Sequence, residues 1–584
     1  MKRRKLVTFM LVAMLLFTTV LSGCTGSGKN DSKSDNTEIG VAEADGEADV
    51  IDHSETLILD VYDTVANYQG KQTGWFGKIL KDKFNLELNI IAPNVAGDAE
   101  SLFQTRAASG NLGDLIIIDN AKLQDCLAAG LISDITRDVP KWENLNKYSE
   151  RITTFNSTLK GADGKVYAIP ACMSNTPADD YTNPTSNGPY LPWDYYSEMG
   201  YPEMENNEDL LNVLEQMQKT YPTNKDGDSA YAITLWADWD NDAMENVVQL
   251  TPWYGEQVNG SLLINGKGGI KELTEDTGAY YKMLHFLYEA NQRGLIDPDS
   301  ATQDWDAACN KMKNKQVYLF WYAWQTGFWN TTERANNDDA YYYIPVKDHK
   351  YFQLADGVYG NGQTWSIGSG VGDVEKARIM EFLDWMSTPQ ANDYLWPGLK
   401  DFNYKVGDDG KYVVIKENED ALMANKEVPA EYGGGGFSDG MNQLNMQIVS
   451  GDDINPLTGE PYAFGKVHVN DPENQTKMSR GWSEKFGASD QVSYLKANNR
   501  MDIVPNINMV LESDTTDIGL IRGQCRQLLV DTSWQMVFAG SEEEFKKKWT
   551  DLKTQLEGMG WKELVAFDKQ KYQKVIDARN AVLK

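Results

Sequence analysis

The sequence predicts an α/β fold built on a doubly wound sheet, and three observations support this. From Glu55 onward, short apolar runs alternate with segments of helical periodicity, which is the pattern of βαβ units. The run 114–119 is almost uninterrupted in its apolar character, as expected for a strand that has helices on both faces. The chain has 584 residues, too many for one ordinary compact domain.

The first third of the chain supplies the expected sheet. Trp75, Ile79, Leu80 and Phe84 recur at helical spacing, and two later helices are each expected to end at a glycine, where a left-handed backbone is tolerated. The expected strands cover 56–62, 86–92 and 114–119, and the expected helices cover 74–84, 98–109 and 122–129.

The remaining elements are fewer and more widely spaced. Helices are expected over 209–219, 278–293, 374–386 and from 542 onward, and strands over 230–235 and 315–321. The run 433–436 consists of four glycines and is expected to be flexible. We find no internal repeat at a solenoid period.

The composition excludes several classes of function. Lys and Arg total 55 against 86 Asp and Glu, giving a net charge of −31, a field that repels nucleic acid. Four His and five Cys, with no CxxC pair, argue against a zinc or haem protein. We therefore expect no cofactor and no metal. The 17 Trp and 29 Tyr are the unusual feature.

The N-terminus predicts export. A basic start and an apolar run of about 15 residues form a secretory signal peptide over 1–23. The small residues before Cys24 resemble a bacterial lipobox, which implies fatty acylation (palmitate) of Cys24. Residues 24–53 are rich in Gly, Ser, Asn and acidic residues and are expected to form a disordered tether. These features predict a lipid-anchored protein on the extracellular face of the bacterial cell membrane.

Several motifs then resemble the family 1 extracellular solute-binding proteins, the receptor lipoproteins of ABC importers for sugars. The similarity runs in order over 56–396. Two departures are Gly113, where proline is usual, and 191–196, which lacks the usual arginine. The segments that carry the resemblance are 75–84, 108–116, 130–135, 163–170, 294–298 and 382–386.

The resemblance implies a two-lobed, periplasmic-binding-protein-like clamshell with interwoven lobes and crossing hinge segments. Hinge crossings are expected near 167–170, near 342–346 and shortly after 386. The N-terminal lobe is expected to comprise 54–168 and 342–388, and the C-terminal lobe 169–341 and 389–584. The implied function is a monomeric surface receptor that captures a sugar, in particular an oligosaccharide, and delivers it to ABC permease subunits without catalysis.

A sugar receptor needs aromatic rings that stack on the apolar faces of pyranoses and carboxylates or amides that bind their hydroxyls. Asp63, Asp119 and Asn120 follow predicted strands, at the sheet edge where ligands bind in such folds. By the resemblance, Tyr322 and Trp324 are the best stacking candidates. The other candidate ligand-binding residues are Trp236, Asp238, Trp239, Trp253, Trp321 and Trp365.

The same residues allow other interpretations. Asp238, Asp240 and Asp242 resemble the start of a calcium loop, but Ala243 and Gln249 stand where glycine and a bidentate glutamate are needed. A secreted glycoside hydrolase would also be acidic and rich in Trp, and nucleophile-elbow and phosphate-loop motifs are absent. A receptor of the same fold for a non-sugar solute or a sensor kinase stays open. The cysteines at 126, 172, 309 and 525 look like buried small hydrophobes, and the sequence does not settle whether any of them pair.

Overall fold

A computed structural model of the chain describes residues 51–95, 99–176, 187–357, 359–463 and 475–582, which belong to one compact unit, Ile51–Lys584. The predicted signal peptide, Cys24 and nearly all of the predicted tether lie outside the described residues.

The first sheet has six strands in the order β2-β3-β1-β4-β13-β5. Strands β3, β1 and β4 are parallel, and β13 runs antiparallel between β4 and β5. Three of these strands confirm predicted ones. The bounds are β1 Leu57–Asp63, β2 Gly70–Lys71, β3 Leu86–Ile91, β4 Leu115–Asp119, β5 Ile169–Pro170 and β13 Gln363–Ile367.

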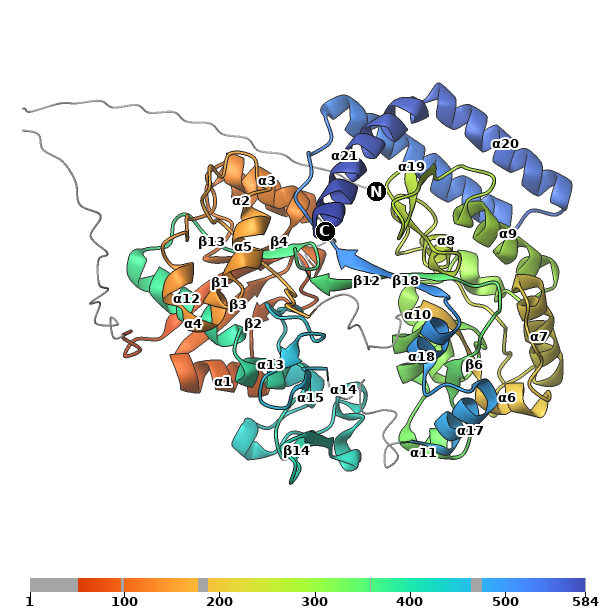
Figure 1. The fold of residues 1–584 in the computed structure, drawn as a ribbon, viewed down its shortest axis with the longest axis horizontal. Helices are drawn as coiled ribbons and strands as arrows, with labels where there is room; N and C mark the ends of the chain where they lie inside the picture. The colour runs from red at the N-terminus through yellow and green to blue at the C-terminus, as the bar shows by residue number, and fades with distance from the viewer. Residues whose placement is uncertain (1–50, 96–98, 177–186, 358, 464–474, 583–584) are drawn as a thin grey trace, which may run out of the picture. The chain divides into compact units, whose positions relative to one another are not determined.

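Alternate residues of β4 pack on opposite faces of this sheet. Leu115 and Ile117 join one hydrophobic core, whereas Ile116 and Ile118 join the other. Helices α1 (Gly74–Phe84) and α12 (Asp373–Met386) contribute to the first core, and α2 (Ala99–Ala108) and α3 (Asn120–Ala128) to the second. Figure 1 shows α2 and α3 on one side of the sheet and α1 on the other. The uninterrupted apolar run is thus explained by burial on both faces.

A second antiparallel sheet places β6 (Asn187–Pro192) between β10 (Phe320–Tyr322) and β11 (Tyr341–Tyr343). Two predicted helices appear nearby as α7 (Asn207–Thr220) and α9 (Ala279–Gln292).

The strand predicted over 230–235 is wrong. The segment forms only single bridges, from Tyr231 to Val317 and from Ile233 to Ile296. Because its two partners belong to different segments, no continuous ladder forms, although its apolar side chains are buried as expected. The strand predicted over 315–321 is correspondingly reduced to β10.

Two strands far apart in sequence pair in parallel: β12 (Tyr351–Gly357) with β18 (Met501–Asn506), as Figure 1 shows. Three long helices complete the C-terminal part, namely α19 (Thr516–Val537), α20 (Glu542–Gly558) and α21 (Trp561–Val582). The predicted terminal helix is confirmed, and α19 was not predicted.

The other elements are short. Their bounds are η1 Pro93–Val95, η2 Val139–Lys141, α4 Glu143–Asn146, α5 Ser149–Asn156, α6 Trp193–Glu198, α8 Glu245–Val248, η4 Thr251–Trp253, β7 Glu256–Asn259, β8 Leu262–Asn265, β9 Ile270–Glu272, η5 Pro298–Ala301, α10 Trp305–Lys313, η6 Ala323–Phe328, α11 Thr332–Asn336, α13 Pro389–Leu395, β14 Tyr404–Val406, β15 Tyr412–Val414, η7 Lys416–Asn418, α14 Ala421–Ala424, η8 Ala430–Tyr432, α15 Phe437–Gly440, β16 Ile454–Asn455, β17 Glu460–Pro461, α17 Lys477–Phe486 and α18 Gln491–Ala497.

The two hydrophobic cores do not follow the predicted lobe bounds. Leu399, Phe437 and Val449, which were assigned to the C-terminal lobe, share a core with α1 and one face of the first sheet. Tyr343 belongs to the larger core, which holds the second sheet and also the other face of the first sheet with α2 and α3. Lobe crossings depend on contacts between distant segments, which local periodicity does not encode.

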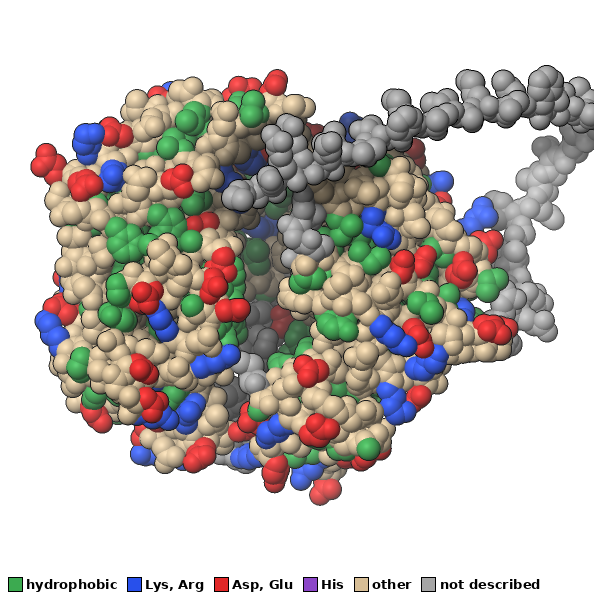
Figure 2. Space-filling view, turned by 180° about the vertical axis from the view of Figure 1, so that it is seen from behind, with side chains coloured by type: hydrophobic (Ala, Val, Ile, Leu, Met, Phe, Trp, Pro, Cys, Tyr) green, Lys and Arg blue, Asp and Glu red, His purple; other side chains and the backbone are tan. Residues whose placement is uncertain are grey.

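The described cysteines Cys126, Cys172, Cys309 and Cys525 are all free. Within the described ranges, no helix combines the length and the apolar character that crossing a membrane requires. Figure 2 shows acidic and basic side chains interspersed over one face of the molecule.

Candidate functional site

The carboxyl ends of β1 and β4 meet where the strand order of the first sheet reverses, which is where such folds bind ligands. Asp63 ends β1 and is fully buried. One of its carboxylate oxygens accepts hydrogen bonds from the backbone N–H groups of Val65 (2.9 Å) and Ala66 (3.1 Å). The other oxygen has no partner among the described residues. Burial raises the pKa of Asp63 to about 7.

Asp119 and Asn120 lie at the end of β4, as predicted. Asp119 caps α3 by accepting a hydrogen bond of 2.9 Å from the backbone N–H of Lys122. The Asn120 side chain donates one of 2.6 Å to the backbone carbonyl of Asn508. Gln363 faces Asp119 across the ladder, and its buried side-chain oxygen has no partner in the described part of the chain. Sequence reasoning missed Gln363 because it favoured the neighbouring tryptophan.

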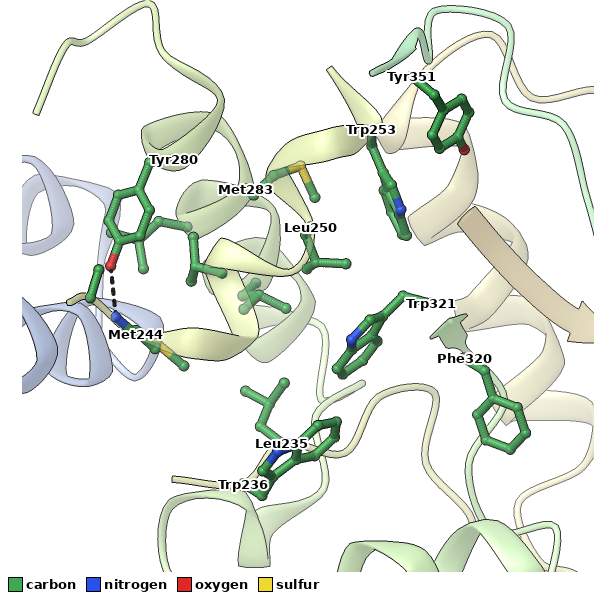
Figure 3. Close-up of a cluster of buried hydrophobic side chains, with 14 of the residues drawn as sticks. Leu235, Trp236, Met244, Leu250, Trp253, Tyr280, Met283, Phe320, Trp321 and Tyr351 are labelled. Atoms are coloured by element: carbon green, nitrogen blue, oxygen red, sulfur yellow. Dashed lines mark hydrogen bonds between the residues drawn. The ribbon is translucent and has the colours of Figure 1, made fainter. Parts of the chain in front are cut away.

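Four predicted stacking residues, Trp236, Trp253, Trp321 and Trp365, are core residues with at most 1% of their surface exposed. Figure 3 shows the first three inside a cluster of buried side chains. The rings of Trp236 and Trp321 stack on each other at 5.3 Å. Because these four rings pack only against the interior, they offer no face to a ligand, and their selection as ligand-binding residues is corrected.

Half-buried and exposed rings lie over this core and form what we call the aromatic platform: Trp239, Trp305, Tyr322, Trp324 and Phe328. Tyr322 and Trp324 lie nearly parallel, 5.7 Å apart. Trp305 lies 4.4 Å from Trp239 and 5.6 Å from Trp324. Trp324 is 48% exposed, so it presents a ring face to solvent. A contiguous set of outward rings of this kind suits ligands with flat apolar faces.

The structure adds Trp305 and Phe328 to the predicted aromatic residues. Trp305 begins α10, and its backbone N–H donates a hydrogen bond of 3.1 Å to the carboxylate of Asp238. Asp238 therefore positions Trp305, a role that sequence spacing did not indicate. Asp304 caps the same helix by accepting a hydrogen bond from the backbone N–H of Ala307. An aspartate at a helix start is visible in the sequence, and this pattern could have indicated the position of Trp305.

A buried amide links the platform to its core. The side-chain oxygen of Gln325 accepts hydrogen bonds of 3.0 Å from the backbone N–H groups of Trp321 and Tyr322. Its side-chain nitrogen is buried and has no partner among the described residues. The same holds for the side-chain nitrogen of Asn246. Both amides thus keep an unused donor beneath the platform.

Glu245 provides a carboxylate next to these amides. It accepts a hydrogen bond of 3.2 Å from the Gln249 side chain, which in turn accepts one of 2.8 Å from the Trp321 indole. Partial burial, with added repulsion from Asp240 and Asp242, raises the pKa of Glu245.

On the other side of η6 lies a cavity of about 650 Å³, within the size range of small-molecule sites. Ala323 and Phe328 line it, so the cavity is continuous with the edge of the platform. Its wall also includes Trp329, Tyr342, Arg334, Glu419 and Asp490.

Two of the three aspartates that resemble a calcium loop, Asp238 and Asp240, accept hydrogen bonds from other parts of the chain. Asp240 accepts hydrogen bonds from the backbone N–H of Glu245 (2.8 Å) and from the Trp534 indole (2.6 Å). Across the described ranges, no group of three or more His, Cys, Asp or Glu side chains is arranged to hold a metal ion.

These features define a two-lobed binding protein. The first lobe is doubly wound and has polar groups at its strand ends, and the second lobe has the aromatic platform. Residues 69–393 match the family of bacterial extracellular solute-binding proteins, and the chain belongs to that family. Proteins of this family are binding proteins, and the α/β, periplasmic-binding-protein-like fold expected from the sequence is confirmed.

One curated relative is the fructooligosaccharide ABC transporter substrate-binding protein FusA of Streptococcus pneumoniae serotype 4, which is 21% identical over 243 residues. That match spans 41% of this chain and 44% of the relative, less than half of either protein.

Solved structures extend the similarity over most of the chain. FusA of S. pneumoniae in complex with kestose has a TM-score of 0.59 and 15% identity, covering 89% of this chain and 100% of that one. A solute-binding protein from Bifidobacterium longum infantis, titled as HMO-binding and associated with an ABC transporter, has a TM-score of 0.55 and 14% identity, covering 88% and 98%. At these identities the likeness shows the fold.

Proposed function

We propose that this protein captures an oligosaccharide outside the cell and delivers it to the permease of an ABC importer without altering it. The observation that carries the proposal is the aromatic platform. The Trp324 indole is 48% exposed and contacts three other rings, those of Trp305, Tyr322 and Phe328, and a contiguous exposed apolar surface of this kind is typical of a binding site. The family and the name of the curated relative support the same function.

In this proposal the two lobes contribute different chemistry. The platform stacks on the apolar faces of sugar rings, and Oε2 of the half-buried Glu245, to which no described residue gives a hydrogen bond, accepts one from a ligand hydroxyl. From the first sheet, the half-buried side chains of Asn120 and Gln363 offer amide oxygens that accept no hydrogen bond from the described residues. Closure of the lobes then removes water from these groups, as in other hinge-type binding proteins.

The proposal extends to how the receptor is held and divided. The protein acts as a monomer, anchored through acylated Cys24 and the tether 24–53. From the elements that surround each sheet, we assign 51–170 and 359–463 to the first lobe and 187–350 and 475–582 to the second. Strand β12 lies in the segment that joins 187–350 to 359–463, and it pairs with β18 of the second lobe.

A thermal-shift screen of the purified chain tests the function. Oligosaccharides of different composition and linkage are compared with peptides of similar mass, because a ligand that binds only the folded state raises the unfolding temperature. We expect at least one oligosaccharide, and no peptide, to raise it in a concentration-dependent manner. A response to peptides alone would contradict the proposal.

A further inference from the structure

We propose that Glu245 makes the site selective for neutral glycans and excludes glycans that carry carboxylates. The inference rests on the proposed function and deepens it by naming the substrate class. It is carried by how Glu245 is held and by the sign of the charges around it.

The Glu245 carboxylate is fixed by a short relay from the core. The Trp321 indole donates to the Gln249 side-chain oxygen at 2.8 Å, and the Gln249 side-chain nitrogen donates to Oε1 of Glu245 at 3.2 Å. Trp321 and Gln249 are both buried, so the relay cannot swing freely. Within the described part of the chain no hydrogen bond is given to Oε2 of Glu245, which leaves this oxygen as an acceptor for a ligand hydroxyl.

Hydrogen bonds place Glu245 near a ring of the platform. Gln249 donates to Glu245 and accepts from Trp321, the residue that precedes Tyr322 in the chain. In agreement with this placement, burial raises the pKa of Tyr322 and the Glu245 carboxylate raises it further. A sugar stacked on Tyr322 and Trp324 would bring its hydroxyls to this carboxylate.

The charges around the platform are mainly negative. Asp240 and Asp242 repel the Glu245 carboxylate, and Asp238 holds the start of α10. The nearby cations are Arg526, which binds the backbone carbonyl of Asp240 at 3.4 Å, and Lys313, whose ammonium lies 5.6 Å from the centre of the Phe328 ring. Arg334 lines the adjoining cavity, where its guanidinium lies 3.7 Å from the centre of the Trp329 ring. Among the described residues, none of these three cations forms an ion pair with Glu245.

The neighbours of Glu245 complete the selection. The buried amides of Gln325 and Asn246 are neutral and hold the backbone beneath the platform, so they do not neutralise a ligand carboxylate. A uronate placed beside Glu245 would meet a like charge, and such a juxtaposition strongly disfavours a wrong ligand.

The experiment compares two ligands that differ only in charge. The neutral oligosaccharide that binds best in the thermal-shift screen is oxidised at its primary C6 alcohols, which gives a uronate with the same backbone and linkage. Calorimetric titration measures the dissociation constants of both glycans for the wild type, Glu245→Gln and Glu245→Asp. Glu563→Gln, which changes an exposed carboxylate of α21, is the matched control.

We expect the wild type and the control to bind the neutral glycan at least about a hundredfold more tightly than the uronate. Glu245→Gln should weaken binding of the neutral glycan by roughly tenfold and reduce the discrimination. Glu245→Asp retains the charge, so it should retain the discrimination while losing affinity for the neutral glycan.

Two results would overturn the inference and leave the proposed function intact: equal or tighter binding of the uronate by the wild type, or an unchanged ratio of affinities in a folded Glu245→Gln variant. If no glycan binds at all, the proposed function fails and the inference fails with it.

Discussion

Replacement of Trp324 by alanine tests whether this ring binds the ligand, as we propose, or only covers the core tryptophans. Trp324 is 48% exposed, whereas Trp321, three residues earlier, is 1% exposed. A tryptophan side chain buries up to about 200 Å² of surface when it is fully covered, so the exposed half of the Trp324 ring offers on the order of 100 Å² to a ligand. At ~25 cal/mol per Å², covering it stabilises the complex by at most about 2.5 kcal/mol, which corresponds to a loss of affinity of about tenfold to seventyfold in Trp324→Ala.

Calorimetric titration with the best-binding oligosaccharide measures this loss, and thermal unfolding measures stability in the same preparations. Trp324→Ala should change the unfolding temperature little. Trp321→Ala should cost about 3–5 kcal/mol of stability because it leaves a cavity in the core. Leu520→Ala, which removes an exposed apolar side chain of α19, is the control for binding. Wild-type affinity in a folded Trp324→Ala variant would refute the stacking role.

Three further variants test the surrounding structure. The pKa of Asp63 is about 7, against an ordinary value of 3.8, so its ionisation lowers the stability of the folded state as the pH rises from about 4 to 7. The unfolding temperature of Asp63→Asn, relative to that of the wild type, should therefore be higher at pH 8 than at pH 5. A difference that stays constant over this range would contradict the prediction. Lys315 is buried between Asp194 and Asp339. Lys315→Met leaves both carboxylates unpaired, so it should lower the free energy of unfolding, measured in urea, by about 3–5 kcal/mol. A loss below about 1 kcal/mol would show that these two ion pairs contribute little. Gln325→Ala removes the acceptor for two backbone N–H groups and should lower both the unfolding temperature and glycan affinity, whereas an effect on neither would exclude its structural and binding roles.

Much of the fold could be predicted from local patterns. The strand β4 and the helices α1, α9 and α12 follow from apolar periodicity, because each buries a regular stripe or both faces. The helix α19 lacks such a signal, since Gly519 and Gly523 interrupt a segment with mixed polarity. The pairing of β12 with β18 joins segments about 150 residues apart, a contact that no local pattern encodes.

The candidate site was predicted only in part for a related reason. Trp321 and Trp324 belong to one aromatic run, yet one indole faces the core and the other faces solvent. Which of them is outward depends on the packing of Trp236 against Trp321, and therefore on the tertiary structure. Trp305 and Glu245 come from helix starts in other segments, so the contact of Trp305 with Trp324 and the link from Glu245 through Gln249 to Trp321 could not be predicted from spacing.

Reversible capture without chemistry is the central claim, and one measurement tests it most directly. The best-binding neutral oligosaccharide is titrated into the purified chain by calorimetry, and the sugar is then recovered and analysed by chromatography. We expect one saturable binding event and a glycan recovered unchanged. Cleaved glycan, or the absence of binding by every oligosaccharide tested, would contradict the claim.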